Sequence, residues 1–356
     1  MKTYLNAINI NPNDKDALFQ LAITIDHISK DQQEITLLSG ESMTKEQLLL
    51  KVIILDPNYA GAYYKLAIVL ADENRSSIIL PSGESMTEKQ LYLKAIECDP
   101  TYSSAFHNLA TTLSDGESIT LHNGISMTEQ QLYLKAIEYD QTSSDSYDNL
   151  SLLLTGGTIT LNNGKSMTKR QLLLKSIEYN PTDSGLYYRL ALTLSKRKPI
   201  TLHNGQTLTQ QQLYLKAIEY DPSHCDPKLS HPYHNLADTL SHSGTIILNN
   251  GRSMNKKQLL LHAIECDPEY PNSYFDLSLL LTTGASITLL NGQSMTKQQL
   301  WFEALKLDYT RSLIYKEIGL SLLNNKQTIT LPDGEQMTRR QLLQKARQFK
   351  TKRSRE

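Results

Sequence analysis

The residue types best suited to metal chemistry gather in one stretch, residues 223–242. Imidazole and thiolate groups are preferred ligands of zinc and copper. A three-residue spacing also places His231 and His234 on one face of a helix. A metal-binding or metal-dependent enzymatic role for residues 224–242 is therefore one hypothesis. The stretch holds four of the nine histidines and one of the three cysteines, namely His224, Cys225, His231, His234 and His242.

A structural interpretation of the same stretch is favoured. Pro232 is typical of the first turn of a helix, and His234 has a counterpart, His107, at an equivalent place earlier in the chain. About five additional residues would then interrupt a packing rhythm and bend the chain locally. We therefore predict no metal and no cofactor.

Other residues that could do chemistry also have structural explanations. Four aspartates, Asp56, Asp99, Asp221 and Asp267, each precede a proline, which cannot continue a helix. The chain contains no phosphate-binding loop, nucleophile elbow or paired catalytic motif. We predict that the protein is not an enzyme, has no catalytic residues and takes no small-molecule substrate.

The last 19 residues are strongly basic. A basic tail can bind nucleic acid, which gives an alternative function. However, Leu342, Leu343, Ala346 and Phe349 continue a helical pattern, which favours a polar helix that caps the fold. The formal net charge of −1 gives no general attraction to nucleic acid or membranes. The basic residues are Arg339, Arg340, Lys345, Arg347, Lys350, Lys352, Arg353 and Arg355.

One eight-residue frame recurs throughout the chain. It consists of Gly, three residues, Thr, two residues and Gln, with Asn255 once in place of Thr. The frame returns about every 41 residues, which indicates a stacked repeat array. It begins at Gly40, Gly83, Gly124, Gly164, Gly205, Gly251, Gly292 and Gly334.

Each repeat predicts a helix, a hairpin and a second helix. Apolar residues at three- and four-residue steps between Ala105 and Leu113 predict the first helix. The Asn123–Gly124 pair between short alternating runs predicts a β-hairpin with a type I′ turn. Thr128 and Gln131 have the spacing of a reciprocal capping box, which predicts the start of the second helix.

The same pattern places the other helices. First helices are predicted over residues 15–29, 58–72, 102–114, 143–155, 183–196, 229–242, 270–282 and 311–323. Second helices are predicted over residues 45–55, 88–98, 129–139, 169–179, 210–220, 256–266, 297–307 and 339–350. Residues 5–12 match the end of a second helix, so we expect the first repeat to be truncated at the N-terminus.

This pattern resembles the tetratricopeptide repeat. The resemblance lies in Asp-Pro, then Ala-Phe-x-x-Leu-Ala-x-x-Leu, then Tyr-x-x-Ala-Ile-Glu-x-Asp, and it covers nearly the whole chain. The family's unit has about 34 residues, and the additional residues here fall at the hairpin. The resemblance implies a mainly α fold, a right-handed α-α superhelix with one short β-hairpin per repeat. We expect a single array of about eight repeats over residues 1–350 and a basic tail over 351–356.

The hairpins allow two arrangements. A two-stranded hairpin is about 10 Å wide, and packed helices lie about 8–10 Å apart. Neighbouring hairpins could therefore pair edge to edge into a sheet along the array. Alternatively, each hairpin packs its Ile and Leu side chains on the helices below it.

The resemblance implies a binding surface along the first helices, which line the concave face of such arrays. The residues expected there are varied, whereas the second helices are nearly identical. Binding on one face would leave this contrast, and so would a solvated face, because exposed positions tolerate change. The tyrosines and histidines suit adaptable hydrogen bonding to an extended peptide or a partner helix. Only Lys316 suits a clamp for a peptide carboxylate, so we expect none. The contact candidates are Tyr64, His107, Asp148, Tyr188, His234, Asp238 and Phe275.

We therefore predict a scaffold or adaptor that binds a protein or peptide in the concave groove, without a nucleic-acid or membrane partner. The three cysteines, Cys98, Cys225 and Cys266, cannot form a disulfide framework, which indicates a reducing compartment. The first residues lack the apolar core of a signal peptide, and no apolar run approaches the length of a membrane helix. We expect a soluble protein in the cytoplasm of its own cell or of a host cell.

Overall fold

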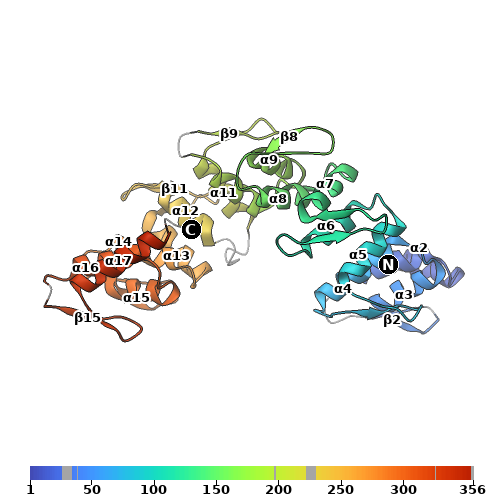
Figure 1. Ribbon diagram of the computed structural model, residues 1–356, viewed down its shortest axis with the longest axis horizontal. Coiled ribbons are helices and arrows are strands. Elements are labelled where there is room, and N and C mark those ends of the chain that lie inside the picture. Colours follow the sequence, from blue (N-terminus) through green and yellow to red (C-terminus); the bar gives the residue numbers. More distant parts are fainter. Residues whose placement is uncertain (26–33, 38, 196–197, 222–229, 325, 354–356) are drawn as a thin grey trace. The chain divides into compact units, whose positions relative to one another are not determined.

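The computed structural model describes residues 1–25, 34–37, 39–195, 198–221, 230–324 and 326–353. The chain forms two compact units, Met1–Tyr179 and Asn180–Glu356. Within each unit, helices follow one another in packed pairs, and a short hairpin connects the two helices of a pair (Figure 1). The mainly helical fold with one hairpin per repeat is confirmed. A single continuous array with a superhelical course stays a prediction.

Each full repeat contributes a first and a second helix. The chain begins with α1 (Lys2–Ile10). The first helices are α2 (Lys15–Thr24), α4 (Ala60–Asp72), α6 (Ser103–Thr111), α8 (Ser144–Leu153), α10 (Ser184–Leu192), α12 (Ser230–Thr239), α14 (Pro271–Leu279) and α16 (Ser312–Ser321). The second helices are α3 (Lys45–Leu55), α5 (Glu88–Cys98), α7 (Glu129–Tyr139), α9 (Lys169–Tyr179), α11 (Gln210–Tyr220), α13 (Lys256–Cys266), α15 (Lys297–Leu307) and α17 (Arg339–Arg353).

The second helices begin where the sequence predicts, because the capping box fixes their first residue. Thr128 Oγ1 accepts a hydrogen bond from the Gln131 amide, and Gln131 Oε1 accepts one from the Thr128 amide. Asn255 does the same for α13. The predicted role of the repeated aspartates is also confirmed, because Asp99 is the C-cap of α5 and its carboxylate accepts from the Thr101 amide.

Most first helices end two to four residues before the sequence pattern does. Thr112 follows α6, and its hydroxyl donates to the Leu109 carbonyl, which supplies a partner at the helix end. Leu113 is buried although it lies beyond the helix. The apolar pattern therefore continues after the backbone has left the helix.

In the described ranges, the strands form eight hairpins. Their bounds are β1 (Glu34–Thr36), β2 (Ser42–Thr44), β3 (Ile78–Ile79), β4 (Ser85–Met86), β5 (Ser118–Thr120), β6 (Ser126–Thr128), β7 (Thr158–Thr160), β8 (Ser166–Thr168), β9 (Ile200–Thr201), β10 (Thr207–Leu208), β11 (Thr245–Ile247), β12 (Ser253–Asn255), β13 (Ser286–Thr288), β14 (Ser294–Thr296), β15 (Thr328–Thr330) and β16 (Gln336–Thr338). In β5–β6, Ile119 pairs with Met127.

The predicted type I′ turn is wrong. That turn needs positive φ at both central residues, but at this hairpin only Gly124 has one, with φ of 81°. The Gly124 amide donates to the Leu121 carbonyl, and the Leu121 amide donates to the Ile125 carbonyl. This is the pattern of a type I turn followed by a glycine bulge. Asn123 is favoured because its Oδ1 accepts from the Ile125 amide.

The hypothesis of a sheet that joins successive hairpins is also wrong. Among the described residues, every sheet has two strands, both from one hairpin. Three hairpin tips instead contact the second helix of the preceding repeat, as when His122 Nε2 lies 3.0 Å from Glu97 of α5. Asn162 donates to Glu138 and Asn249 donates to Glu219 at equivalent places. These three hairpins therefore contact neighbouring repeats through side chains.

The C-terminal basic residues belong to a helix that packs on its neighbour. Leu342 is fully buried in α17, and the Phe349 ring stacks on Tyr315 of α16 at 5.6 Å. Arg339 donates to the Leu322 carbonyl, and Lys345 pairs with Glu335. The predicted helical pattern is therefore confirmed, while residues 354–356 of the tail lie outside the described residues. No helix in the described ranges is both long and apolar enough to cross a lipid bilayer.

Candidate functional site

The last turns of the first helices expose leucines at one repeated position. In the unit Asn180–Glu356 these are Leu192 of α10, Leu279 of α14 and Leu320 of α16, which we call the leucine column. Their exposed fractions are 52%, 46% and 47%. Asp238 of α12 occupies the same position and is also exposed. Leu152 of α8 is the counterpart in the unit Met1–Tyr179, with 52% exposed.

The predicted contact tyrosines are half-buried and their hydroxyls are engaged. Asn108 Nδ2 donates to the hydroxyls of Tyr64 and Tyr92, at 3.3 Å and 3.2 Å. Asn235 donates to Tyr188 at 3.2 Å. Burial raises the pKa of Tyr188 to about 12, so this phenol is neutral near pH 7. The hydroxyls of these tyrosines are therefore engaged within the protein.

Two of the predicted contact residues are buried. Phe275 is 7% exposed and His234 is 4% exposed, so each offers a partner little surface. His107 and Asp148 are half-buried. His107 Nδ1 lies 2.9 Å from Ser146 Oγ, and burial lowers the pKa of His107. The structure therefore leaves Asp238 as the most exposed member of the predicted set.

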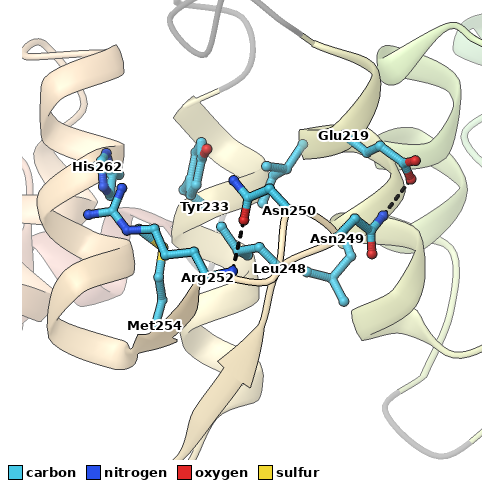
Figure 2. A pocket seen from close by; sticks show the side chains of 10 residues that line it. Glu219, Tyr233, Leu248, Asn249, Asn250, Arg252, Met254 and His262 are labelled. Carbon is cyan, nitrogen blue, oxygen red and sulfur yellow. Dashed lines mark hydrogen bonds between the residues drawn. The ribbon is translucent and has the colours of Figure 1, made fainter.

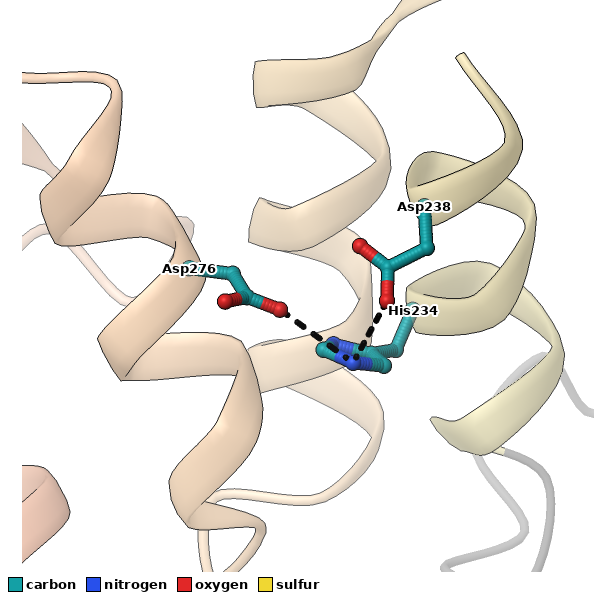
Figure 3. Close-up of side chains that lie close together, drawn as sticks. All are labelled: His234, Asp238 and Asp276. Carbon is teal, nitrogen blue, oxygen red and sulfur yellow. Dashed lines mark ion pairs between the residues drawn. The ribbon is translucent and has the colours of Figure 1, made fainter. Parts of the chain in front are cut away.

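The structure brings His234 and Asp238 together with Asp276, which the sequence interpretation missed (Figure 3). His234 Nε2 lies 3.6 Å from Asp238 Oδ2 and 3.4 Å from Asp276 Oδ2. The three ligand atoms lie within 4.8 Å of one another. His234 and Asp238 come from successive turns of α12, and Asp276 comes from α14, the first helix of the next repeat.

The surroundings shift the pKa values of two members of this cluster. Burial lowers the pKa of His234, which favours the neutral imidazole. Burial and the neighbouring Asp238 raise the pKa of Asp276 to about 6. Ser273 Oγ lies 3.3 Å from His234 Nδ1, and Lys256 Nζ lies 3.5 Å from Asp238 Oδ1. Nε2 of His234 and one oxygen of each carboxylate thus converge on one point.

The other predicted ligands do not join this cluster. His231 contacts the ring of Tyr270 at 4.4 Å between centroids. His224 and Cys225 lie outside the described residues. Asp276 could have been found by aligning the repeats, because the same position holds Asn108, Asn149 and Asn235 in other first helices. A carboxylate in this asparagine position is the signal in the sequence.

A pocket of about 290 Å³ lies beneath the β11–β12 hairpin (Figure 2). Tyr233 of α12 and His262 of α13 form one side, with their rings 5.7 Å apart. The turn residues Asn249 and Arg252 form another. A pocket of about 240 Å³ lies at the equivalent place beneath β5–β6, between His122 and Lys135. Because both pockets recur with the hairpin, we interpret them as a consequence of the fold.

The paired helices and recurring hairpins define an α-helical repeat protein. Four segments, residues 91–131, 132–171, 172–212 and 259–299, match the family model described as "Tetratricopeptide repeat". These four segments therefore carry the tetratricopeptide-repeat pattern, and in the structure a β-hairpin separates the two helices of each repeat. No curated protein matches the chain.

Three solved structures are among those similar to the chain. Yeast Tom70 matches with 17% identity and a TM-score of 0.38, over 99% of this chain and 58% of that chain. YrrB, titled "a TPR protein with an unusual peptide-binding site", matches with 15% identity and a TM-score of 0.34, over 62% and 93%. Pseudomonas aeruginosa pilF matches with 17% identity and a TM-score of 0.36, over 86% and 97%. The chain thus spans less than two thirds of the Tom70 chain.

Proposed function

We propose that this protein is a scaffold that binds an extended peptide or a helix of a partner protein along its first helices. The observation that carries the proposal is the leucine column. Single exposed apolar side chains are ordinary, but the same position exposes a leucine on three of the four first helices of one unit. A repeated apolar position on one face is what a partner with regularly spaced apolar side chains would use.

Asp238 gives this surface its polarity. It replaces the leucine of the column on α12, so a partner that lies along the column meets a carboxylate between apolar contacts. Tyr188 lies four residues, about one helical turn, before Leu192 of the leucine column, and Tyr64 of α4 occupies the equivalent position in its own repeat. Both rings are half-buried. We propose Tyr64, His107, Asp148, Tyr188 and Asp238 as contacts, with His234 and Phe275 supporting the surface from below.

The test compares two triple variants of the full chain in a pull-down. The first is L192S/L279S/L320S, which removes the leucine column. The matched control is I79S/I125S/I247S, which removes three exposed isoleucines from the hairpins, with exposed fractions of 68%, 52% and 67%. Exposed substitutions of this kind change stability by about 0.5 kcal/mol or less, so both variants should fold. Circular dichroism checks this.

We expect a partner that the wild type and the hairpin variant retain and that the leucine-column variant loses. Equal recovery by all three proteins would contradict binding along the first helices. Loss from the hairpin variant alone would move the binding surface to the hairpins.

A further inference from the structure

We propose that His234, Asp238 and Asp276 form a binding site for a divalent transition-metal ion such as Zn²⁺. The proposal goes beyond the scaffold function and does not depend on it. One imidazole nitrogen and two carboxylate oxygens are a donor set that zinc uses in proteins. Three protein ligands leave further coordination positions, which water can fill.

The distances fit a metal better than they fit hydrogen bonds. A hydrogen bond from an imidazole N–H to a carboxylate oxygen has a length of about 2.7–3.2 Å. His234 Nε2 lies 3.4 Å and 3.6 Å from its two carboxylate neighbours. In a tetrahedron with metal–ligand bonds of about 2.1 Å, neighbouring ligand atoms lie about 3.4 Å apart. The two His–Asp distances are therefore close to the edges of a zinc tetrahedron.

The third edge of this tetrahedron can close easily. The two carboxylate oxygens lie within 4.8 Å of each other, and their side chains are on different helices. The Asp238 side chain is 45% exposed, so small rotations can bring its oxygen closer without disturbing the core. The exposure of Asp238 also gives an ion a path to the buried imidazole beside it.

Ser273 orients the imidazole as outer-shell residues orient metal ligands. In the tautomer with the proton on Nδ1, that N–H points to Ser273 Oγ at 3.3 Å, and the Nε2 lone pair points between the two carboxylates. A lone pair that faces two carboxylate oxygens is unfavourable unless a cation or a proton lies between them. Ser273 is fully buried, so its hydroxyl holds the ring in a fixed position.

The basic residues nearby do not neutralise both carboxylates. Lys256 lies 3.5 Å from Asp238 Oδ1, whereas His234 lies nearest to Oδ2 of the same carboxylate. Arg311 pairs with Asp308 at 3.2 Å. Lys256 and Arg311 attract Asp276 electrostatically, but in the described part of the chain no Lys or Arg forms an ion pair with it. A bound dication would supply the missing charge.

The experiment measures Zn²⁺ binding to the full chain, freed of its affinity tag and treated with a chelator. Isothermal titration with ZnCl₂ gives affinity and stoichiometry, and the visible absorption of added Co²⁺ reports on the ligand set. The main variant is D238T/D276N, because the chain itself has Thr111 and Asn149 at the equivalent positions. The single variant D238T changes only an exposed residue, so it provides a second test if the double variant does not fold.

We expect the wild type to bind one zinc ion that D238T/D276N binds at least about 100-fold more weakly. S273A, which removes a positioning residue, should weaken binding by about 10- to 100-fold. Folding of each variant is checked by circular dichroism. Absence of zinc binding to the wild type overturns the proposal. Equal affinity and equal Co²⁺ spectra for the wild type and the folded D238T/D276N variant also overturn it, because the ion would then lie elsewhere.

Discussion

His107 in α6 and His234 in α12 occupy the same position in their repeats, and each faces a serine on the next first helix. Ser146 and Ser273 both lie 39 residues after their histidine. The two histidines differ in what surrounds Nε2. Thr111 and Asn149 stand near His107 at the positions where His234 has Asp238 and Asp276.

The second helices explain why the asparagine can become an aspartate. In the first site, the Asn149 side chain bonds to the hydroxyl of Tyr133 of α7, much as Asn108 donates to Tyr92. In the second site, the residue equivalent to Tyr133 is Leu260, which is fully buried and offers no hydroxyl. Both repeats thus keep a buried residue at this position of the second helix, while the polar residue of the first helix that faces it can change its type and its function.

The largest effect is expected when the two carboxylates of the His234 site are introduced at the equivalent positions of the His107 site. In T111D/N149D, His107 gains both carboxylates, so we expect the number of bound zinc ions to rise from one to two. Isothermal titration measures this number. Addition of Y133L removes one further difference between the sites, the hydroxyl of Tyr133. A folded T111D/N149D/Y133L protein that still binds one ion would show that the comparison omits a necessary residue.

Zinc should also stabilise the unit that contains the site. His234 and Asp276 lie on successive first helices, so an ion that binds both links two repeats only in the folded state. At a free Zn²⁺ concentration 100-fold above Kd, the free energy of unfolding should rise by about 2.7 kcal/mol. Urea denaturation of the wild type with and without ZnCl₂ measures the change. D238T/D276N is the control, and an equal gain in that variant would contradict the link.

The same glycine substitution in the hairpin turn should destabilise the two units by equal amounts. Gly124 and Gly251 have φ of 81° and 80°, and nothing lies within 4 Å of an added Cβ at either residue. Gly→Ala at either position should cost about 1–2 kcal/mol through backbone strain alone. Gly156→Ala is the control, because its φ is not positive, and it should stabilise by about 0.4–1 kcal/mol. A large difference between G124A and G251A would show that the two units do not share one hairpin geometry.

The sequence predicted the frame well and the cluster poorly, for physical reasons. The starts of the second helices depend on local hydrogen bonds, such as those between Thr128 and Gln131, which a short motif encodes. The end of α6 was placed too late because Leu113 is buried without being helical. Asp276 was missed because its partners lie about 40 residues away, and only the packing of α14 against its neighbours brings them together.

The smallest effect concerns protonation at His107, the site without the acidic pair. Burial lowers the pKa of His107, while Asp145 opposes this in part, so the folded protein favours the neutral ring. An unfolded histidine has a pKa of about 6.5. The resulting stability is present above pH 6.5 and is lost as the pH falls below it, because the unfolded chain then binds the proton more readily. We therefore expect urea denaturation to show a smaller loss of stability between pH 7.5 and pH 5.5 in H107N than in the wild type. Asparagine keeps a polar group near Ser146 but cannot titrate, so equal losses in both proteins would mean that His107 is protonated as easily in the folded state as in the unfolded one.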